Sequence, residues 1–334
     1  MIKALALQER TPAVAPVTNP GGLNPDPAIA LARLDERLMH APPPVRQGWI
    51  NRALIHEAVA SLRLNGFYAA ARDLTLMLED ATERIPDQDL SRAVTIHQMI
   101  TSMGRRDPRH MFNARRLLVM TSLRLRGKPV GHPELPSWLT RHRDPEQVRD
   151  TLDEAFSPTA VSGWKKLPPL EAAGAIMAHW HAIGAAESIG AAPGRALAAA
   201  WVHRAGLVSG YYFLPSIGFF GHAMDYRPDL QARWPRLFLE SASRSIDWGL
   251  KLHRHLLATH RRLHEAARSQ RSTSHMPLLI DLLVAHPAIS ADRAAQRLGV
   301  TSHAVRGLFS RLEKTGLVHE LTGRGSFRLY GLTP

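Results

Sequence analysis

The sequence predicts a mainly α-helical protein that ends in a small β-hairpin. Three observations lead to this prediction. Apolar side chains recur at helical spacing through most of the first 270 residues, no alternation of apolar and polar residues occurs before residue 286, and 45% of the residues are hydrophobic, enough to bury a core. With 334 residues, the chain is long enough for two or three domains.

The first helical region is expected to span residues 27–130. It follows residues 1–26, which are rich in Pro, Gly and Asn and are expected to form an irregular arm. Many Pro, Gly and His residues between 127 and 170 indicate an internal boundary. The apolar spacing predicts helices over 28–39, 45–64, 67–82, 88–103 and 111–126.

The second helical region is expected to span residues 131–274. It ends in the polar stretch RSQRSTS, which is typical of a linker. A short helix is predicted near 145–155, and longer helices over 170–187, 195–208 and 236–268, the last of them basic.

Residues 275–334 carry the most specific pattern in the chain. A first helix is expected around Leu279 and should end before Pro287, where proline interrupts the backbone hydrogen bonds. Ser290 stands where the N-cap of a second helix belongs, and Gly299 supplies the tight turn after it. The apolar stripe of this second helix is Ala291, Ala294, Ala295 and Leu298.

A third helix and a hairpin complete this C-terminal region. Thr301 or Ser302 is expected to cap the helix, and Gly316 to end it. LVHEL, TGRG and SFRLYGL then predict a hairpin with its turn at 322–325. The apolar face of the helix is Val305, Leu308, Phe309 and Leu312.

The order helix, helix, glycine turn, helix and hairpin resembles the winged helix-turn-helix DNA-binding domains of bacterial regulators. Outward side chains of the third helix are placed to meet base edges, and those of the wing to meet phosphates or a minor groove. Winged helices that only dock proteins are the alternative. The candidate DNA-binding residues are Thr301, Ser302, His303, Arg306, Ser310 and Arg311 on the helix and Arg324 and Arg328 on the wing.

The charge balance indicates a polyanionic partner. The chain has 42 Lys and Arg residues against 29 Asp and Glu residues, a net charge of +13, and no cationic amphipathic membrane anchor is visible. The excess is concentrated in residues 101–128, with eight cations against one acid, and in residues 251–275, with six against one. Double-stranded DNA is therefore the expected partner, and a general arginine background is the alternative.

The composition and the absence of known motifs exclude several classes of protein. The chain has no cysteine, and therefore no disulfide framework, cysteine zinc site or thiol nucleophile. It contains no P-loop, G-x-S-x-G or H-E-x-x-H motif, and His179 and His181 are only two residues apart, so they point in different directions on a helix. It also contains no run of about 18 apolar residues, and its first residues are not expected to act as a signal peptide. We expect a soluble, cytoplasmic protein without a cofactor, a metal ion or a membrane partner.

Two segments of the helical regions resemble Fic proteins. Residues 53–81 resemble the N-terminal part of that family, where a Ser-x-x-x-Glu-Gly inhibitory motif closes a helix; here Asn65 takes the place of the glutamate. Residues 167–209 resemble the Fic core helix, active-site loop and following helix. The family loop, His-x-Phe-x-(Asp/Glu)-Gly-Asn-Gly-Arg-x-x-Arg, falls on residues 184–195. The resemblance covers most of residues 45–330 and implies a Fic-like body.

The departures from the Fic pattern imply an inactive enzyme. In that family the histidine takes a proton from the target hydroxyl and the carboxylate holds Mg²⁺. Here Gly184 replaces the histidine and Ser188 replaces the carboxylate, while Arg195 keeps the last arginine. Glycine cannot act as a base, and a serine hydroxyl is a poor ligand for Mg²⁺. Only a shift of register would bring Glu187 into a metal site.

The small-residue turn before the helix at Arg195 suggests an anion site. Free amides at a helix N-terminus bind phosphate, and an arginine in the first turn opposes the helix dipole unless an anion or a carboxylate compensates it. Gly190, Gly194 and Arg195 are the candidate residues for a nucleotide or phosphate effector. The alternative is that Arg195 pairs with Glu187 or another carboxylate and the glycines merely turn the chain.

The sequence as a whole predicts a bacterial transcriptional regulator. Its winged helix is expected to bind DNA, and its catalytically inactive Fic-like body to form a homodimer or to sense a ligand. Two alternatives remain open. One is a Fic-type nucleotidyl or phosphoryl transferase with a non-standard active site, and the other is a protein-interaction adaptor whose winged helix binds no DNA.

Overall fold

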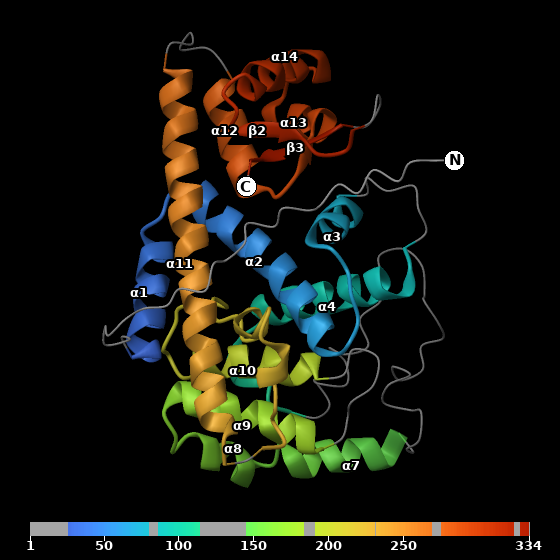
Figure 1. Cartoon of the computed structure of the whole chain (residues 1–334), viewed down its shortest axis with the longest axis vertical. Coiled ribbons are helices and arrows are strands. Elements are labelled where there is room, and N and C mark those ends of the chain that lie inside the picture. Colours follow the sequence, from blue (N-terminus) through green and yellow to red (C-terminus); the bar gives the residue numbers. More distant parts are fainter. Residues whose placement is uncertain are drawn as a thin grey trace.

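One 34-residue helix, α11 (Trp234–Ala267), runs along the molecule and joins its helical body to its C-terminal unit (Figure 1). The computed structural model describes residues 26–79, 86–113, 145–183, 191–230, 232–268, 275–323 and 328–333. In it, α11 packs against α1 (Pro27–Met39), α2 (Pro43–Leu64) and α9 (Pro169–Ala182) of the body, and against α12 (Met276–Ala285) of the C-terminal unit.

The described part of the body is mainly helical, as the sequence predicts. Several of its helices begin at a proline, whose missing N–H is not needed in a first turn and whose φ is already close to helical. The remaining elements of the body are α3 (Ala71–Leu78), α4 (Gln88–Gly104), η1 (Pro108–His110), α7 (Pro145–Ala155), α8 (Pro158–Trp164), α10 (Ala192–Arg204), η2 (Ile217–Phe219) and η3 (Ala223–Asp225).

Some helix boundaries differ from the expected ones. The helix expected over 67–82 begins only at Ala71, and the one expected over 195–208 begins at Ala192, because Pro193 fits its first turn. The sequence pattern does not predict α8, a seven-residue helix whose N-cap Ser157 accepts a hydrogen bond from the Ala160 amide at 3.4 Å. The helix expected over 111–126 lies almost entirely outside the described residues, and 111–113 are not helical.

Two tryptophans tie α11 to the body through indole-to-carbonyl hydrogen bonds. The Trp49 indole of α2 donates to the Gly249 carbonyl of α11 at 2.8 Å, and the Trp234 indole of α11 donates to the Gly174 carbonyl of α9 at 2.8 Å. Both indoles are buried, so each hydrogen bond satisfies a donor that would otherwise be costly to bury. These contacts hold α2, α9 and α11 in one packed unit.

The C-terminal unit has the arrangement of a winged helix. After α12 come β1 (Ile289–Ser290), α13 (Ala291–Leu298), α14 (Ser302–Glu313), β2 (Val318–Glu320) and β3 (Leu329–Leu332). The three strands form an antiparallel sheet in the order β1-β3-β2, in which Tyr330 lies opposite Ile289 on one side and Glu320 on the other. The predicted hairpin is present, although residues 324–327 of its turn lie outside the described residues. The short strand β1 is an addition that the sequence pattern does not predict.

The helix ends of this unit follow the predicted signals. The Ser290 hydroxyl accepts from the Arg293 amide at 3.1 Å, and the Thr301 hydroxyl accepts from the Ala304 amide at 3.3 Å, so Thr301, and not Ser302, is the N-cap of α14. Gly299 ends α13 with φ of 68°, a left-handed conformation that side chains disfavour. The turn between α13 and α14 is therefore fixed from both sides.

The C-terminal unit is held on the body by the end of α12. The Arg52 guanidinium of α2 donates to the carbonyls of Val284 at 2.8 Å and His286 at 2.9 Å, and the Asn51 amide donates to the Ala285 carbonyl at 2.8 Å. The two helices approach so closely that a Cβ at Gly48 would lie 2.1 Å from the Val284 carbonyl oxygen. Side chains of α2 thus take up carbonyls that a helix C-terminus leaves without partners.

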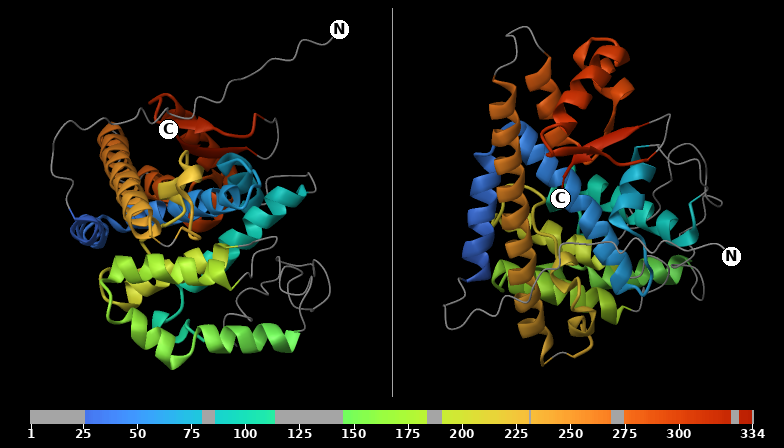
Figure 2. Two further views of the ribbon diagram at one scale, coloured as in Figure 1. Left: turned by 60° about the horizontal axis from the view of Figure 1, so that its bottom comes forward. Right: turned by 45° about the horizontal axis from the view of Figure 1, so that its top comes forward.

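The wing side of the unit makes a second contact, with α3. The Arg72 guanidinium donates to the Leu321 carbonyl, which follows β2, at 2.6 Å. Arg293 of α13 forms an ion pair with Glu79, the residue that follows α3. Figure 2 shows the sheet of the C-terminal unit lying over α2 and next to α3. With contacts to α2, α3 and α11, the unit is fixed to the body at several points.

Among the described residues, none of the helices combines the length and the apolar character that crossing a membrane requires.

Replacing Arg52 by methionine should weaken the attachment of the C-terminal unit. We expect the free energy of unfolding of Arg52→Met to fall by about 2–4 kcal/mol, because carbonyls at a buried helix end lose their donors at about 1–3 kcal/mol each. Arg52→Lys keeps the charge without the planar fork and should lose less. Urea denaturation followed by circular dichroism measures the difference.

The matched control is Arg236→Met, at an arginine of α11 that is 86% exposed and pairs with Glu240 on its own helix. Its effect should stay within about 0.5 kcal/mol. An Arg52→Met protein as stable as the control would contradict the role given to the guanidinium.

Candidate nucleic-acid interface

Helix α14 buries one face and presents the other to solvent. Val305, Phe309 and Leu312 are buried, and the Phe309 ring stacks on the Tyr330 ring of β3 with centroids 4.0 Å apart. In Figure 1, α14 lies at the end of the molecule opposite α7, α8 and α9. Of the predicted DNA-binding residues on this helix, Ser302 is half-buried, and the exposed ones are Thr301, His303, Arg306, Ser310 and Arg311.

The exposed side chains of α14 differ in how far they are engaged. The Thr301 hydroxyl oxygen accepts the capping hydrogen bond, so its O–H and its methyl group remain for contact with a ligand. The nearest Arg306 nitrogen lies 3.9 Å from a carboxylate oxygen of Asp292, and the two side chains are 62% and 69% exposed. An exposed pair at this distance contributes little, so a nucleic acid can replace it at low cost.

The wing contributes Arg328, while the predicted Arg324 lies outside the described residues. Arg328 is exposed directly before β3, and its positive charge acts on Glu320. Burial alone would raise the pKa of Glu320, but hydrogen bonds from Thr322 and Gly323, together with the charge of Arg328, outweigh it and lower the pKa. Glu320 therefore stays ionised and shapes the start of the wing, where it accepts the amides of Thr322 and Gly323 at 2.7 and 3.0 Å.

The second half of α11 carries much of the basic charge predicted for it. Lys251, Arg254, Arg261, Arg262 and Arg268 are all exposed on this helix, which runs up to the C-terminal unit (Figure 1). The other basic segment, 101–128, is described only to residue 113, and its Arg109 pairs with Asp107 at 2.8 Å. Of the two predicted basic segments, 251–268 is therefore the one whose described part adjoins the winged helix.

The arginine predicted to sit at an anion site is buried between α2 and α10. Only 1% of Arg195 is exposed. Its guanidinium donates to the Ser61 hydroxyl at 2.9 Å, the Ser61 carbonyl at 2.8 Å, the Asn65 amide oxygen at 3.0 Å and the Tyr226 hydroxyl at 3.1 Å. All four acceptors are neutral. The network brings together the two segments that carry the resemblance to Fic proteins.

Helix α2 also carries a buried carboxyl group, that of Glu57, one turn before Ser61. Glu57 accepts hydrogen bonds from the amides of Ser216 at 3.0 Å and Ile217 at 3.1 Å. Burial raises its pKa to about 7, although these hydrogen bonds and the charge of Arg195 act in the opposite direction. Near neutral pH this carboxyl is thus only partly ionised, and it offsets the charge of Arg195 incompletely.

The start of α10 has no room for a side chain at Gly194. A Cβ at Gly194 would lie 2.6 Å from Cβ and Cγ of Trp180 on α9, so glycine is required there by the close approach of the two helices. Gly190 and the residues aligned with the Fic histidine and carboxylate, Gly184 and Ser188, lie outside the described residues, as does Glu187. The structure therefore describes only the helical side of the predicted anion site.

One group of possible metal ligands escapes the sequence analysis. His260 and His264 of α11 and Asp281 of α12 gather where the body meets the C-terminal unit. The two histidines are four residues apart, a spacing that places them on one face of a helix and was a usable signal. The carboxylate comes from another helix, so its approach follows only from the tertiary structure.

Comparison with known proteins identifies the C-terminal unit. Residues 276–333 match a family model described as an HTH DNA binding domain. Among curated proteins, the uncharacterized protein y4cF of Sinorhizobium fredii (strain NBRC 101917 / NGR234) is 34% identical over 84 residues, which are 25% of this chain and 21% of that protein. The match therefore spans about one fifth of the length of this curated relative.

Among solved structures, the crystal structure of a Fic family protein from Desulfovibrio desulfuricans G20 is similar to this chain. The match has 15% sequence identity and a TM-score of 0.43, and it covers 94% of this chain and 98% of the other. The C-terminal unit is thus a helix-turn-helix DNA-binding domain, as the sequence predicts, and a Fic family protein is a structural neighbour of the chain.

Proposed function

We propose that this protein is a sequence-specific double-stranded DNA-binding protein that acts as a bacterial transcriptional regulator in the cytoplasm. The observation that carries the proposal is the orientation of the winged helix. The body holds it through α12, through Arg293 of α13 and through Leu321 after β2, and these contacts leave the polar face of α14 in solvent. A face that served to dock the body would be covered.

In the proposed complex, α14 enters the major groove and the wing follows the backbone. Arg306 has a planar fork that matches the two acceptors of guanine, and His303 and Ser310 flank it on the same exposed face. Ser302 and Arg311 lie at the edges of this face. Arg328, with Arg324, is proposed to contact phosphates or the minor groove. The exposed cations of α11 extend the positive surface toward the body.

We further propose that the protein binds as a homodimer. Winged and other helix-turn-helix proteins that recognise palindromes place two recognition helices about one turn of DNA apart. The body, which contacts the winged helix through α2, α3 and α11, is proposed to supply the dimer contact.

Substitutions of two arginines should distinguish base readout from phosphate contact. Arg306→Ala in the full chain should weaken binding to the preferred sequence by about 1–3 kcal/mol and reduce the preference over unrelated duplexes. Arg328→Ala should weaken all duplexes alike and flatten the dependence of log Kd on log salt by about one unit. A genomic footprint supplies the preferred duplex, and fluorescence anisotropy at several salt concentrations measures both effects.

Arg236→Ala, at an exposed cation near the other end of α11, is the control and should leave the affinity unchanged. Wild-type protein that binds no duplex at low salt would contradict the proposal and favour the adaptor.

For the body, we propose a Fic-like scaffold without Fic catalysis. The Arg195 contacts with Ser61 and Asn65 support the alignment, because they join the very segments that resemble the family's inhibitory helix and active-site loop. In that alignment Gly184 stands in place of the catalytic histidine and Ser188 in place of the metal-binding carboxylate. Loss of the base alone costs about 10²–10⁴ in rate.

Catalytic silence is tested directly with labelled ATP. In the presence of Mg²⁺, neither α- nor γ-labelled ATP should transfer label to the protein itself or to a cell extract above the level of a heat-denatured sample. Label transfer that Glu187→Ala abolishes would restore the transferase interpretation.

We also propose that an anion, phosphate or the phosphate group of a nucleotide, binds at the N-terminus of α10 beside Arg195. Among the described residues, the guanidinium donates its hydrogen bonds to neutral oxygens, and the nearby Glu57 compensates its charge only in part. An anion over the first turn of α10 would supply the rest and also suit the positive end of the helix dipole.

Calorimetry with ATP, ADP and inorganic phosphate tests this site. Wild-type protein should release or absorb heat with at least one of these anions. Arg195→Lys, which keeps a cation in the core, should bind it several-fold more weakly. Arg204→Lys, at the other end of α10, should bind as the wild type does. Equal or absent heats in all three proteins would exclude the site.

A further inference from the structure

We infer that His260, His264 and Asp281 form a binding site for a divalent transition-metal ion that joins α11 to α12. Nε2 of His260 and Nε2 of His264 lie 2.9 and 3.0 Å from the same carboxylate oxygen, Oδ1 of Asp281. The three potential ligand atoms all lie within 4.8 Å of one another. The inference goes beyond the proposed DNA binding and requires none of it.

The spacing of these atoms suits a shared metal ion. Zinc-class ions bind imidazole nitrogens at about 2.0–2.1 Å and carboxylate oxygens at about 2.0–2.2 Å. Two ligands at such distances are separated by about 2.9 Å at an angle of 90° and by about 3.4 Å at the tetrahedral angle typical of zinc. The nitrogen-to-oxygen separations of 2.9 and 3.0 Å therefore match octahedral spacing and would have to widen slightly around zinc. On binding, the rings would have to rotate until both nitrogens lie about 2.0–2.1 Å from the ion.

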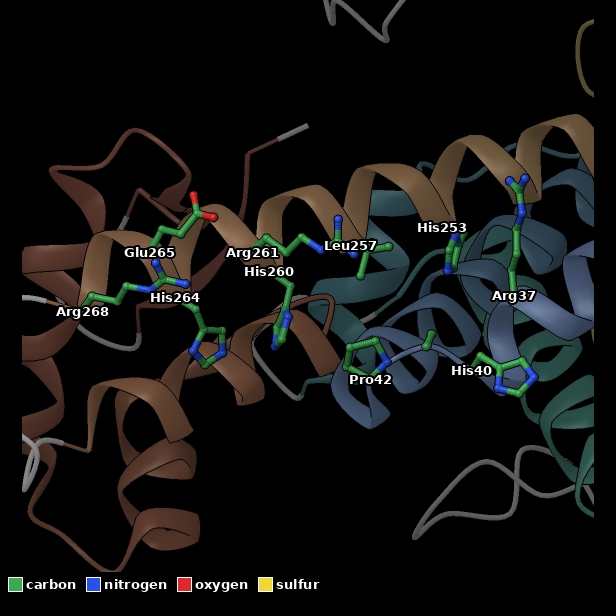
Figure 3. A pocket seen from close by; sticks show the side chains of 11 residues that line it. Arg37, His40, Pro42, His253, Leu257, His260, Arg261, His264, Glu265 and Arg268 are labelled. Carbon is green, nitrogen blue, oxygen red and sulfur yellow. The ribbon is translucent and has the colours of Figure 1, made fainter.

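The two histidines line an open hollow, from which water can complete the coordination shell. His260 and His264 project from the same side of α11 into a hollow of about 630 Å³ (Figure 3). The opposite wall is formed by the end of α1 and the start of α2, at His40 and Pro42. Both histidines and Asp281 are partly exposed, which leaves a path for an ion to enter.

The ligands select the class of ion. Two imidazoles and a single carboxylate are typical of Zn²⁺, Ni²⁺ and Co²⁺ sites, whereas Ca²⁺ and Mg²⁺ prefer several oxygen ligands. The other charged groups that line the cavity are mostly cationic, with Arg37, Arg261 and Arg268 against Glu265. These positive charges disfavour a cation that is held by electrostatic attraction alone. The affinity for a metal ion would therefore come from coordination by the histidine nitrogens.

The position of the site gives it a structural consequence. His260 and His264 belong to the last turns of α11, and Asp281 lies on α12, the first helix of the DNA-binding domain. A metal ion would therefore link the domain to the body independently of the contacts that α2 makes. An effect on DNA affinity would rest on the proposed function, but metal binding itself can be measured without DNA.

The test is a metal titration of the full chain after treatment with a chelator. Isothermal titration with ZnCl₂ should show one site per chain, and Zn²⁺ should raise Tm because it binds only the folded protein. CoCl₂ should give the visible absorption of a nitrogen- and oxygen-ligated ion. His260→Ala, His264→Ala and Asp281→Ala should each weaken zinc binding by about 10-fold or more, and MgCl₂ should give no heat.

The matched control is His255→Ala, on an exposed histidine of the same helix that is not part of the cluster. It should bind zinc as the wild type does and keep the gain in Tm. Wild-type protein without a zinc site, or zinc binding that the three cluster variants leave unchanged, would overturn the inference. Asp281→Asn, which conserves size and folding, separates lost coordination from lost structure, since its Tm without metal should stay close to that of the wild type.

Discussion

The position of the DNA-binding domain depends on how the last carbonyls of α12 find hydrogen-bond donors. A helix leaves these groups unpaired at its C-terminus, and α12 ends against the body and not in open solvent. Arg52 and Asn51 of α2 supply the donors, and the positive guanidinium also suits the negative end of the helix dipole. Burial lowers the pKa of Arg52 to about 10, which still leaves it charged at neutral pH. Burial, and then the positive charges of Arg297, Arg293 and Arg52, lower the pKa of His286 to about 4. This histidine therefore stays neutral at neutral pH.

Helix α2 makes a second set of polar contacts near its C-terminal end. There Ser61 and Asn65 accept hydrogen bonds from Arg195, and the Glu57 carboxyl group accepts a hydrogen bond from the Ser216 amide. One 22-residue helix thus carries both the docking contacts of the winged helix and the buried network around α10. Its buried residues include an almost continuous run from Ala53 to Leu62, so they surround the helix and do not form a single apolar stripe.

Local signals were enough to predict the winged helix from the sequence. Ser290 and Gly299 mark the ends of α13 through side-chain capping and a left-handed backbone, effects that act within a few residues. The body was predictable as helical. Arg195 stands out in the sequence as a cation in the first turn of a helix, and its role as an anion ligand stays a prediction. Its surroundings were not predictable, since Ser61 and Asn65 lie about 130 residues away in the chain. The Arg52 contacts and the histidine–aspartate cluster escaped for the same reason. They depend on which helices pack together, and periodicity does not contain that information.

The close packing of α2 on α12 limits how this protein can have been assembled and how it can be taken apart. Buried side chains of the body and of the winged helix belong to one continuous hydrophobic cluster, and the backbones meet at Gly48 without room for a methyl group. The DNA-binding domain is therefore not an independent unit that can be exchanged without its neighbour. A winged helix transferred to another gene would need a matching α2 to pack against. Cutting the chain at residue 275 would expose apolar surface on both fragments.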